Sequence, residues 1–148
     1  MKRHAWMALT IVSLLVLLGA SAASAGSVEL RADIPFNFMA GNNMLPAGTY
    51  HVSQAVASHG VLLISNQKPD HGATFVQTIS SEKGRTQTET RLIFNRYGDR
   101  YFLSQVWTAG RISGYMIPKS SQERELAREL AAMGTRGLEV VSIVASVK

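Results

Sequence analysis

Residues 91–107 read RLIFNRYGDRYFLSQVW, and this stretch decides the fold class. Two runs rich in β-branched and aromatic residues flank Gly98 and Asp99, and glycine at the first position of a two-residue loop favours a type II′ β-hairpin. Such a loop fixes the pairing of the two strands and sets Phe94 opposite Leu103. The stretch therefore predicts an antiparallel hairpin whose Phe94 face belongs to the core.

The chain before this hairpin also alternates between apolar and polar residues with period two, which indicates strands with one buried face. We expect a strand over 34–38, a returning strand over 49–53 that pairs with it, and a strand buried on both sides over 61–64. Residues 73–79 form the next expected strand. Residues 80–88 are the most polar stretch and are expected to form a mobile loop.

After the hairpin, a short strand is expected over 112–117, and the apolar period then changes to a helical one. Ser120 lies three residues before Glu123, which is the spacing of a capping box. One narrow apolar stripe follows at helical spacing, made of Leu126, Leu130 and Met133. Gly134 suits the position just past the helix end. Alternation returns over 139–147, which predicts a last strand.

These elements predict an all-β, mainly antiparallel fold, either a small β-barrel or a β-sandwich of about eight strands with one C-terminal α-helix before the last strand. The barrel is slightly preferred. A single domain of this size buries roughly two-thirds of the surface of its unfolded chain, so it can form a core without disulfide bonds.

The first residues have the pattern of a secretory signal peptide. Lys2 and Arg3 supply positive charge, residues 5–18 are apolar, and residues 23–25 are Ala-Ser-Ala, the small-residue motif at which a signal peptidase cuts. We expect residues 1–25 to be removed.

Two alternatives to that cleavage remain open to the sequence. Cleavage after residues 20–22, also Ala-Ser-Ala, would leave a slightly longer chain. A membrane anchor is disfavoured because the apolar stretch has about 14 residues, whereas a spanning helix needs about 20. The expected mature protein is one β-rich domain, residues 26–148, exported to the periplasm or the extracellular space.

Composition excludes several classes of protein. The chain has no cysteine, which excludes disulfide scaffolds, thiolate zinc sites and cysteine nucleophiles. Loss of Lys2 and Arg3 with the leader lowers the net charge from +5 to +3, which does not favour nucleic acid as a partner. No second apolar segment reaches membrane-spanning length, so we expect no transmembrane segment in the mature chain.

Four strings occur together in a characteristic order: IPFNF at 34–38, LPAGTY at 45–50, RYGDRYFL at 96–103 and KSSQEREL at 119–126. In these strings the chain resembles a family of small, exported, uncharacterised β-rich proteins seen mostly in acidobacterial genomes. The resemblance implies a β-rich fold and the envelope of a Gram-negative cell. It implies no activity and no catalytic residue.

The sequence shows no pattern typical of an enzyme. His51, His59 and His71 lack the spacing of metal ligands, no Gly-x-Ser-x-Gly string occurs, and the acidic residues are dispersed among turns and strand ends. We therefore predict a protein that is not an enzyme, with no catalytic, cofactor-binding or metal-ligating residue and no cofactor.

One group of residues on the central hairpin is a candidate binding surface. It consists of Arg96, Tyr97, Arg100, Tyr101 and Trp107. The expected register puts Tyr97 opposite Arg100 and Arg96 opposite Tyr101, where a cation–π pair can form. Arginine and aromatic side chains together suit carbohydrate, anionic polymers or a partner protein. The plainer interpretation is an exposed hairpin face that binds nothing.

The leading hypothesis is a non-enzymatic binding or structural module of the cell envelope, with an envelope polysaccharide or protein as partner. One alternative is a small barrel that carries an apolar ligand, in an interior lined by Phe36, Phe38, Phe75, Phe94 and Leu103. The other is a hydrolase with an atypical site, in which one of the three histidines lies near an acidic residue.

Overall fold

The computed structural model describes residues 28–55, 60–134 and 137–147, so the expected leader lies outside the described residues. Five strands form a first sheet, in which every pair is antiparallel. In spatial order these are β12 (Ser146–Val147), β1 (Glu29–Ile34), β4 (Gly48–Gln54), β5 (Val61–Asn66) and β6 (Ala73–Gln77). A short 3₁₀ helix, η1 (Pro69–His71), connects β5 to β6.

The second sheet contains the central hairpin. In spatial order its main strands are β11 (Glu139–Val144), β8 (Arg91–Tyr97), β9 (Arg100–Trp107), β10 (Ser113–Met116) and β7 (Ile79–Glu82). The small hairpin of β2 (Phe38–Ala40) and β3 (Asn43–Leu45) joins this sheet where β2 pairs with β9, in a parallel orientation. The expected all-β, mainly antiparallel fold is confirmed.

Two bent strands connect the sheets. Only Thr78 separates β6 from β7, and only Ala145 separates β11 from β12, so each segment begins in one sheet and ends in the other. At both bends the intervening N–H leaves the strand pairing and donates to a loop carbonyl, from Thr78 to Gly60 at 2.7 Å and from Ala145 to Thr90 at 2.9 Å.

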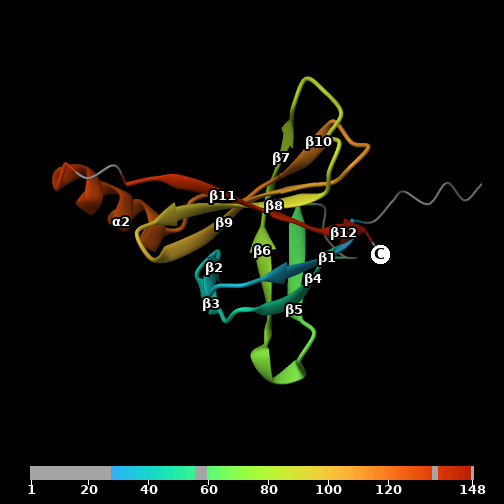
Figure 1. The fold of residues 1–148 in the computed structure, drawn as a ribbon, viewed down its shortest axis with the longest axis horizontal. Helices are drawn as coiled ribbons and strands as arrows, with labels where there is room; N and C mark the ends of the chain where they lie inside the picture. The colour runs from blue at the N-terminus through green and yellow to red at the C-terminus, as the bar shows by residue number, and fades with distance from the viewer. Residues whose placement is uncertain (1–27, 56–59, 135–136, 148) are drawn as a thin grey trace, which may run out of the picture.

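The slight preference for a barrel is wrong, because the strand pairing of the two sheets does not close into one ring. The architecture is a sandwich in which β6 crosses the long strands β8, β9 and β11 steeply (Figure 1). Strands that switch sheets are typical of such crossed packing. The described chain has twelve strands instead of about eight, since each bent strand counts twice and the β2–β3 hairpin was not foreseen.

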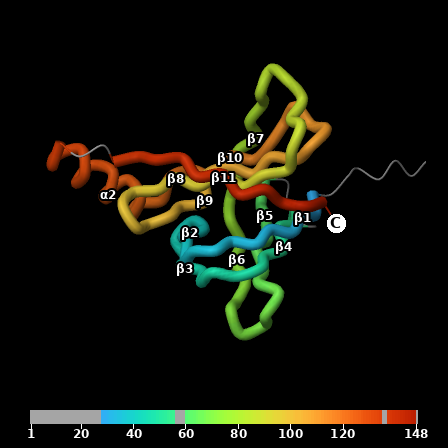
Figure 2. Tube along the Cα trace, in the orientation of Figure 1, coloured from blue at the N-terminus to red at the C-terminus, as the bar shows by residue number. Residues whose placement is uncertain are grey.

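The core lies between the two sheets. Side chains that point inward from both are fully buried, among them Leu30, Tyr50, Val52, Leu62, Ile64, Leu92, Phe94 and Val106. The C-terminal segment runs from the helix along the second sheet and ends beside β1 (Figure 2). This course lets Val141 and Ile143 of β11 pack against the core from its edge.

The central hairpin has the predicted register. Gly98 has a φ of 62°, and no described non-glycine residue has a positive φ, which is the pattern of a type II′ turn. Phe94 pairs with Leu103, as expected. A bulge follows between Ile93 and Phe94, where the Ser104 hydroxyl donates to the Ile93 carbonyl at 3.0 Å.

Three stretches differ from expectation. The strand expected over 34–38 is broken after Ile34, because β1 belongs to the first sheet and β2 to the second. Only one face of β5 is fully buried, whereas burial on both sides was expected. The stretch 80–88 begins as strand β7, and Gln87 farther along is buried and bonded through its backbone to Arg111 and Gly110.

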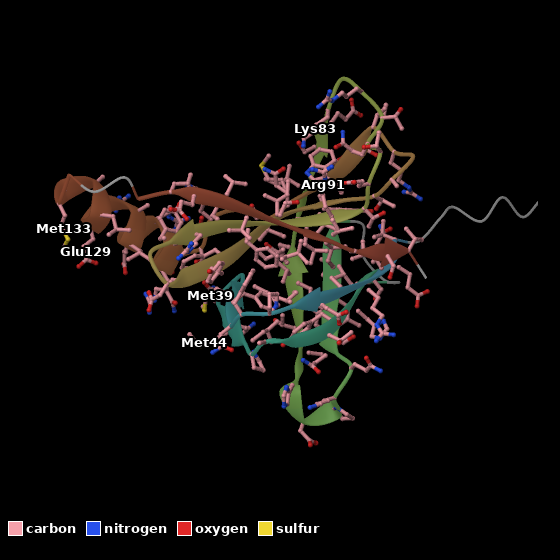
Figure 3. The ribbon with its side chains drawn as sticks, in the orientation of Figure 1. Met39, Met44, Lys83, Arg91, Glu129 and Met133 are labelled. Carbon is pink, nitrogen blue, oxygen red and sulfur yellow. The ribbon has the colours of Figure 1, made fainter. Side chains whose placement is uncertain are left out.

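Helix α2 (Ser121–Ala132) begins and ends as predicted. The Ser120 hydroxyl accepts a hydrogen bond from the Glu123 N–H at 3.1 Å, and Gly134 follows the helix with a φ of 67°. Leu126 and Leu130 of the apolar stripe pack on a second small core. Met133, the third member, is 65% exposed and lies at the outer end of the helix (Figure 3).

The second core contains a buried polar network around Glu123, which is only 3% exposed. Its carboxylate accepts hydrogen bonds from Asn95 Nδ2 at 2.7 Å and from Tyr97 Oη at 3.3 Å. Lys119 Nζ in turn donates to Tyr97 Oη at 3.2 Å. Glu123 therefore connects α2 to the hairpin, a role that the capping-box pattern does not predict.

We expect Glu123→Ala to lower the free energy of unfolding by about 2–3 kcal/mol, because it leaves the buried Tyr97 hydroxyl and the half-buried Asn95 amide without their acceptor. Urea denaturation measures this loss. Glu125→Ala, at an exposed position of the same helix, is the matched control and is expected to change stability by less than about 0.5 kcal/mol. Equal losses in the two variants would contradict the structural role of Glu123.

Candidate functional site

The surface predicted on the central hairpin is not assembled as expected. Tyr97 is 3% exposed and Trp107 is 1% exposed, so neither is available to a ligand. Tyr97 is buried because α2 covers this end of the hairpin, together with Met39 and Phe102. Two elements distant in sequence thus bury a face that we expected to meet solvent.

Trp107 is buried at the other end of the same strands. Its ring lies against Gly114 of β10, and Lys83 Nζ lies 4.4 Å from the ring centroid. Its Nε1 donates to Gln105 Oε1 at 2.8 Å. Figure 3 labels Lys83, together with Arg91 of β8, whose strand position pairs with that of Trp107.

The other three members of the predicted surface differ in exposure. Arg100 is exposed. Arg96 forms an ion pair with Glu139 at 3.0 Å and lies 5.5 Å from the centre of the Tyr101 ring, the expected cation–π pair. Tyr101 is half-buried and stacks on Phe36 with ring centroids 3.8 Å apart. A binding role for Arg96, Arg100 and Tyr101 stays a prediction.

The residues proposed to line an apolar cavity do not surround one space. Phe38, Phe94 and Leu103 are buried, and Phe36 packs edge-on against Phe94 with ring centroids 5.2 Å apart. Phe75 points outward and is 68% exposed. Aromatic rings in mutual contact occupy this part of the core, which gives no support to an apolar cargo there.

The two histidines that the structure describes lie on different elements. His51 lies on β4 and His71 in η1, while His59 lies outside the described residues. In the part of the chain that the structure describes, no three side chains of the metal-ligating types gather.

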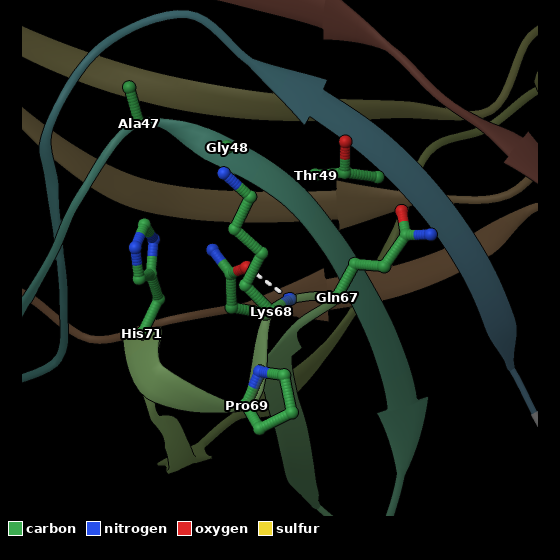
Figure 4. A pocket seen from close by; sticks show the side chains of 8 residues that line it. Ala47, Gly48, Thr49, Gln67, Lys68, Pro69 and His71 are labelled. Carbon is green, nitrogen blue, oxygen red and sulfur yellow. Dashed lines mark hydrogen bonds between the residues drawn. The ribbon is translucent and has the colours of Figure 1, made fainter.

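A pocket of about 450 Å³ with both polar and apolar walls lies where β4 begins and η1 follows β5. This volume falls within the range of about 300–1,000 Å³ that is usual for small-molecule sites. The pocket is lined by Ala47, Gly48, Thr49, Asn66, Gln67, Lys68, Pro69 and His71 (Figure 4). We call it the β4–η1 pocket.

Strand pairing brings the two halves of this pocket together. Tyr50 of β4 pairs with Asn66 of β5, which places the start of β4 beside the turn that leads into η1. Asn66 Oδ1 accepts from the Lys68 N–H at 2.7 Å, and the Gln67 N–H donates to the Thr49 carbonyl at 2.9 Å. These bonds hold the backbone of the pocket, so its side chains project from a fixed frame.

Gly48 keeps the pocket open. A Cβ atom at this position would lie 2.8 Å from Asn66 Nδ2, which is closer than such atoms normally approach. The Asn66 amide also lies beside Tyr50, whose pKa is raised above its usual 10.0 mainly by burial, an effect that Asn66 opposes. The absence of a side chain at residue 48 therefore leaves room for the amide.

Two polar atoms in this pocket lack hydrogen-bond partners. His71 Nδ1 is buried and makes no hydrogen bond with any described group, while the buried Asn66 Nδ2 lies near the Tyr50 hydroxyl, whose pKa it lowers against the effect of burial, without a hydrogen bond of normal geometry. Only two other buried side-chain atoms in the described residues share this property, on Thr78 and Arg91. Because buried polar groups are nearly always paired, unpaired atoms that gather at one pocket suggest that a ligand or water completes them.

The sequence gives little sign of this site. Residues 65–72 have the composition of a polar loop, and His71 attracts attention only as an isolated histidine. The hydrogen bond from the Lys68 N–H to the Asn66 side chain forms a local turn of a kind that asparagine favours. Nothing local shows that Gly48 and Thr49 lie beside this turn.

No protein-family model, curated protein or solved structure matches the chain. The resemblance to exported acidobacterial proteins therefore stays a prediction. No helix among the described residues is both long and apolar enough to cross a membrane. The fold and the pocket together define an antiparallel β-sandwich with a polar hollow at the end of one sheet.

Proposed function

We propose that the mature protein is an exported, non-enzymatic binding module of the periplasm or the extracellular envelope, and that the β4–η1 pocket holds a small polar ligand. The observation that carries this proposal is the pair of unpaired buried atoms, Asn66 Nδ2 and His71 Nδ1, on the lining of one pocket. Fixed polar groups in a concave site are what orient small ligands in binding proteins.

The sequence supports the export part of the proposal. Residues 1–25 carry the charge, apolar stretch and Ala-Ser-Ala motif of a signal peptide, and a chain without cysteine is compatible with an oxidising compartment. An envelope polysaccharide is the partner class that best suits a pocket rich in hydrogen-bonding side chains.

Binding is favoured over catalysis by the chemistry of the lining. His71 is the only group of the pocket that suits a general base, and the one hydroxyl side chain, that of Thr49, already donates to Asp33. Because the Thr49 hydroxyl donates to Asp33 and not to His71, it lacks the adjacent histidine base that usually activates a hydroxyl nucleophile.

Native mass spectrometry of the mature protein, purified from the periplasm of its own cells, tests the proposal. We expect a polar adduct of a few hundred daltons that is lost on denaturation and strongly reduced in Gly48→Val, whose side chain enters the pocket. Gly84→Val is the matched control, because nothing lies within 4 Å of a Cβ atom there. Circular dichroism confirms that both variants fold.

Two outcomes would overturn the proposal. An adduct of unchanged occupancy in folded Gly48→Val would place the ligand elsewhere, and Arg96 and Arg100 would be the next residues to vary. An apolar adduct that extracts into organic solvent would instead support the carrier of apolar cargo.

A further inference from the structure

The β4–η1 pocket has a one-sided charge. Of its eight lining residues, Lys68 is positively charged, His71 can take a proton, and none is acidic. Arg31 adds a second cation, a guanidinium, at the rim, where its Nη2 donates to Gln67 Oε1 at 3.1 Å. Two acids flank the pocket without lining it: Asp33, whose carboxylate accepts from the Thr49 hydroxyl, and the exposed Asp70, which stands between Pro69 and His71 in η1. The lining therefore favours a negatively charged ligand.

The two polar groups without normal hydrogen bonds, on Asn66 and His71, also favour a ligand that accepts hydrogen bonds. Asn66 Nδ2 is an amide nitrogen and can only donate, while the Asn66 amide oxygen already accepts from Lys68 N. His71 Nδ1 is a second donor when it carries the ring proton. Two donors and an ammonium group on one pocket match the two oxygens of a carboxylate, which accepts several hydrogen bonds at once.

Lys68 is placed to take part in binding. It is exposed, and its side chain runs across the pocket toward Gly48 (Figure 4). The Asn66 and His71 atoms lie below the surface of the pocket, so a ligand that reaches them must displace part of the lining. A long, flexible and exposed lysine chain is the part that can move and then contact the ligand with its charge.

We infer that the β4–η1 pocket recognises a carboxylate on a hydroxylated carbon skeleton, such as a uronate residue of an envelope polysaccharide. This inference rests on the proposed function, which it narrows from a polar ligand to a sugar acid. Lys68 and Asn66 hold the carboxylate. Gln67 and Thr49 offer polar contacts to hydroxyl groups, and Pro69 offers a small apolar surface to the C–H face of a sugar ring.

Titration of the mature protein with D-glucuronate and with D-glucose, followed by amide chemical shifts in NMR spectra, tests the inference, because the two sugars differ in the carboxylate. We expect shifts at residues 47–49 and 66–71, and an affinity for glucuronate about tenfold or more above that for glucose, as a charge-assisted contact provides. Lys68→Gln is expected to remove most of this preference.

Arg128→Gln is the matched control, since it removes one positive charge from an exposed position of α2 and should leave the preference unchanged. Equal affinity for glucose and glucuronate at these residues would overturn the carboxylate inference and leave the proposed function standing. Acetate or inorganic phosphate that binds more tightly than glucuronate would overturn the sugar-acid class. An absence of pocket shifts with every probe, together with a bare mass in native spectra, would overturn the proposed function itself.

Discussion

Phe94→Ala is expected to lower the free energy of unfolding by about 3–5 kcal/mol, the usual cost of deleting a buried phenylalanine ring. Phe94 is fully buried, and its ring meets those of Phe36 and Phe38 edge-on, with centroids 5.2 and 5.4 Å away. Phe36 and Phe38 belong to the segment that passes from the first sheet to the second, so the lost ring contacts connect both layers. Urea denaturation at 25 °C measures the loss.

Phe75→Ala is the matched control for this prediction. Phe75 is 68% exposed on β6, so the same truncation removes little buried surface there and is expected to change stability by less than about 0.5 kcal/mol. A large loss in Phe75→Ala would show that its ring packs inside the protein. That result would contradict the outward position of Phe75 and restore the apolar cavity as a serious alternative.

The comparison of Phe75 with Phe94 shows what alternation in a sequence can and cannot predict. Period two separates the side chains of a strand into two faces, but it does not say which face meets the core. Phe94 was assigned correctly because the turn at Gly98 pairs it with Leu103, another apolar residue. Phe75 lies on a strand whose pairing no two-residue turn fixes. Whether its side chain points toward the core therefore depends on residues distant in sequence.

Tyr97 and Trp107 show a second reason for failure. Tyr97 lies on the hairpin face opposite Phe94, which the sequence predicts to be exposed if that face meets solvent, and the bulge between Ile93 and Phe94 places Trp107 on the same face. The structure buries them because α2 covers Tyr97, while β10 and Lys83 cover Trp107. The ends of α2 were predicted well, since Ser120 and Gly134 act within one helical turn, but the surface on which a helix packs is a non-local property.

The β4–η1 pocket was missed for the same physical reason. Its turn at Asn66 is local, whereas its other wall depends on the pairing of Tyr50 with Asn66 across two strands. A hairpin with a two-residue loop would have fixed that register, but the loop between β4 and β5 is longer. Charged and aromatic residues are also the usual sequence signals of a binding surface, and these occur on the central hairpin. A neutral asparagine such as Asn66 gives no such signal.

Gly114→Ala is expected to lower the free energy of unfolding by about 2–3 kcal/mol, the upper part of the range of about 1–3 kcal/mol that is usual for an extra methyl group forced into a filled core. The added Cβ would lie 2.5 Å from Trp107 Cε3 and 2.8 Å from two further ring carbons. The indole cannot easily retreat, since it is 1% exposed, bonded to Gln105 and covered by Lys83. To avoid the clash between the new Cβ atom and the indole, β9 and β10 must therefore move apart.

Trp107 also supplies the measurement. The only other tryptophan, Trp6, lies in the expected leader, so the tryptophan fluorescence of the mature protein, excited selectively over its tyrosines, reports Trp107 alone. We expect a red shift of its emission in folded Gly114→Ala, together with the loss of stability in urea. Gly84→Ala is the matched control and should change neither, because nothing lies within 4 Å of a Cβ atom at that residue.

A double-mutant cycle makes the cause specific. If contact with the indole is the origin of the loss, Gly114→Ala costs much less in a Trp107→Ala background, and the two changes show a coupling of about 1–3 kcal/mol. Additive losses would contradict the contact and would point to the backbone of β10 instead. The cycle thus tests whether one missing side chain on β10 is what allows the hairpin to bury its outward-facing tryptophan.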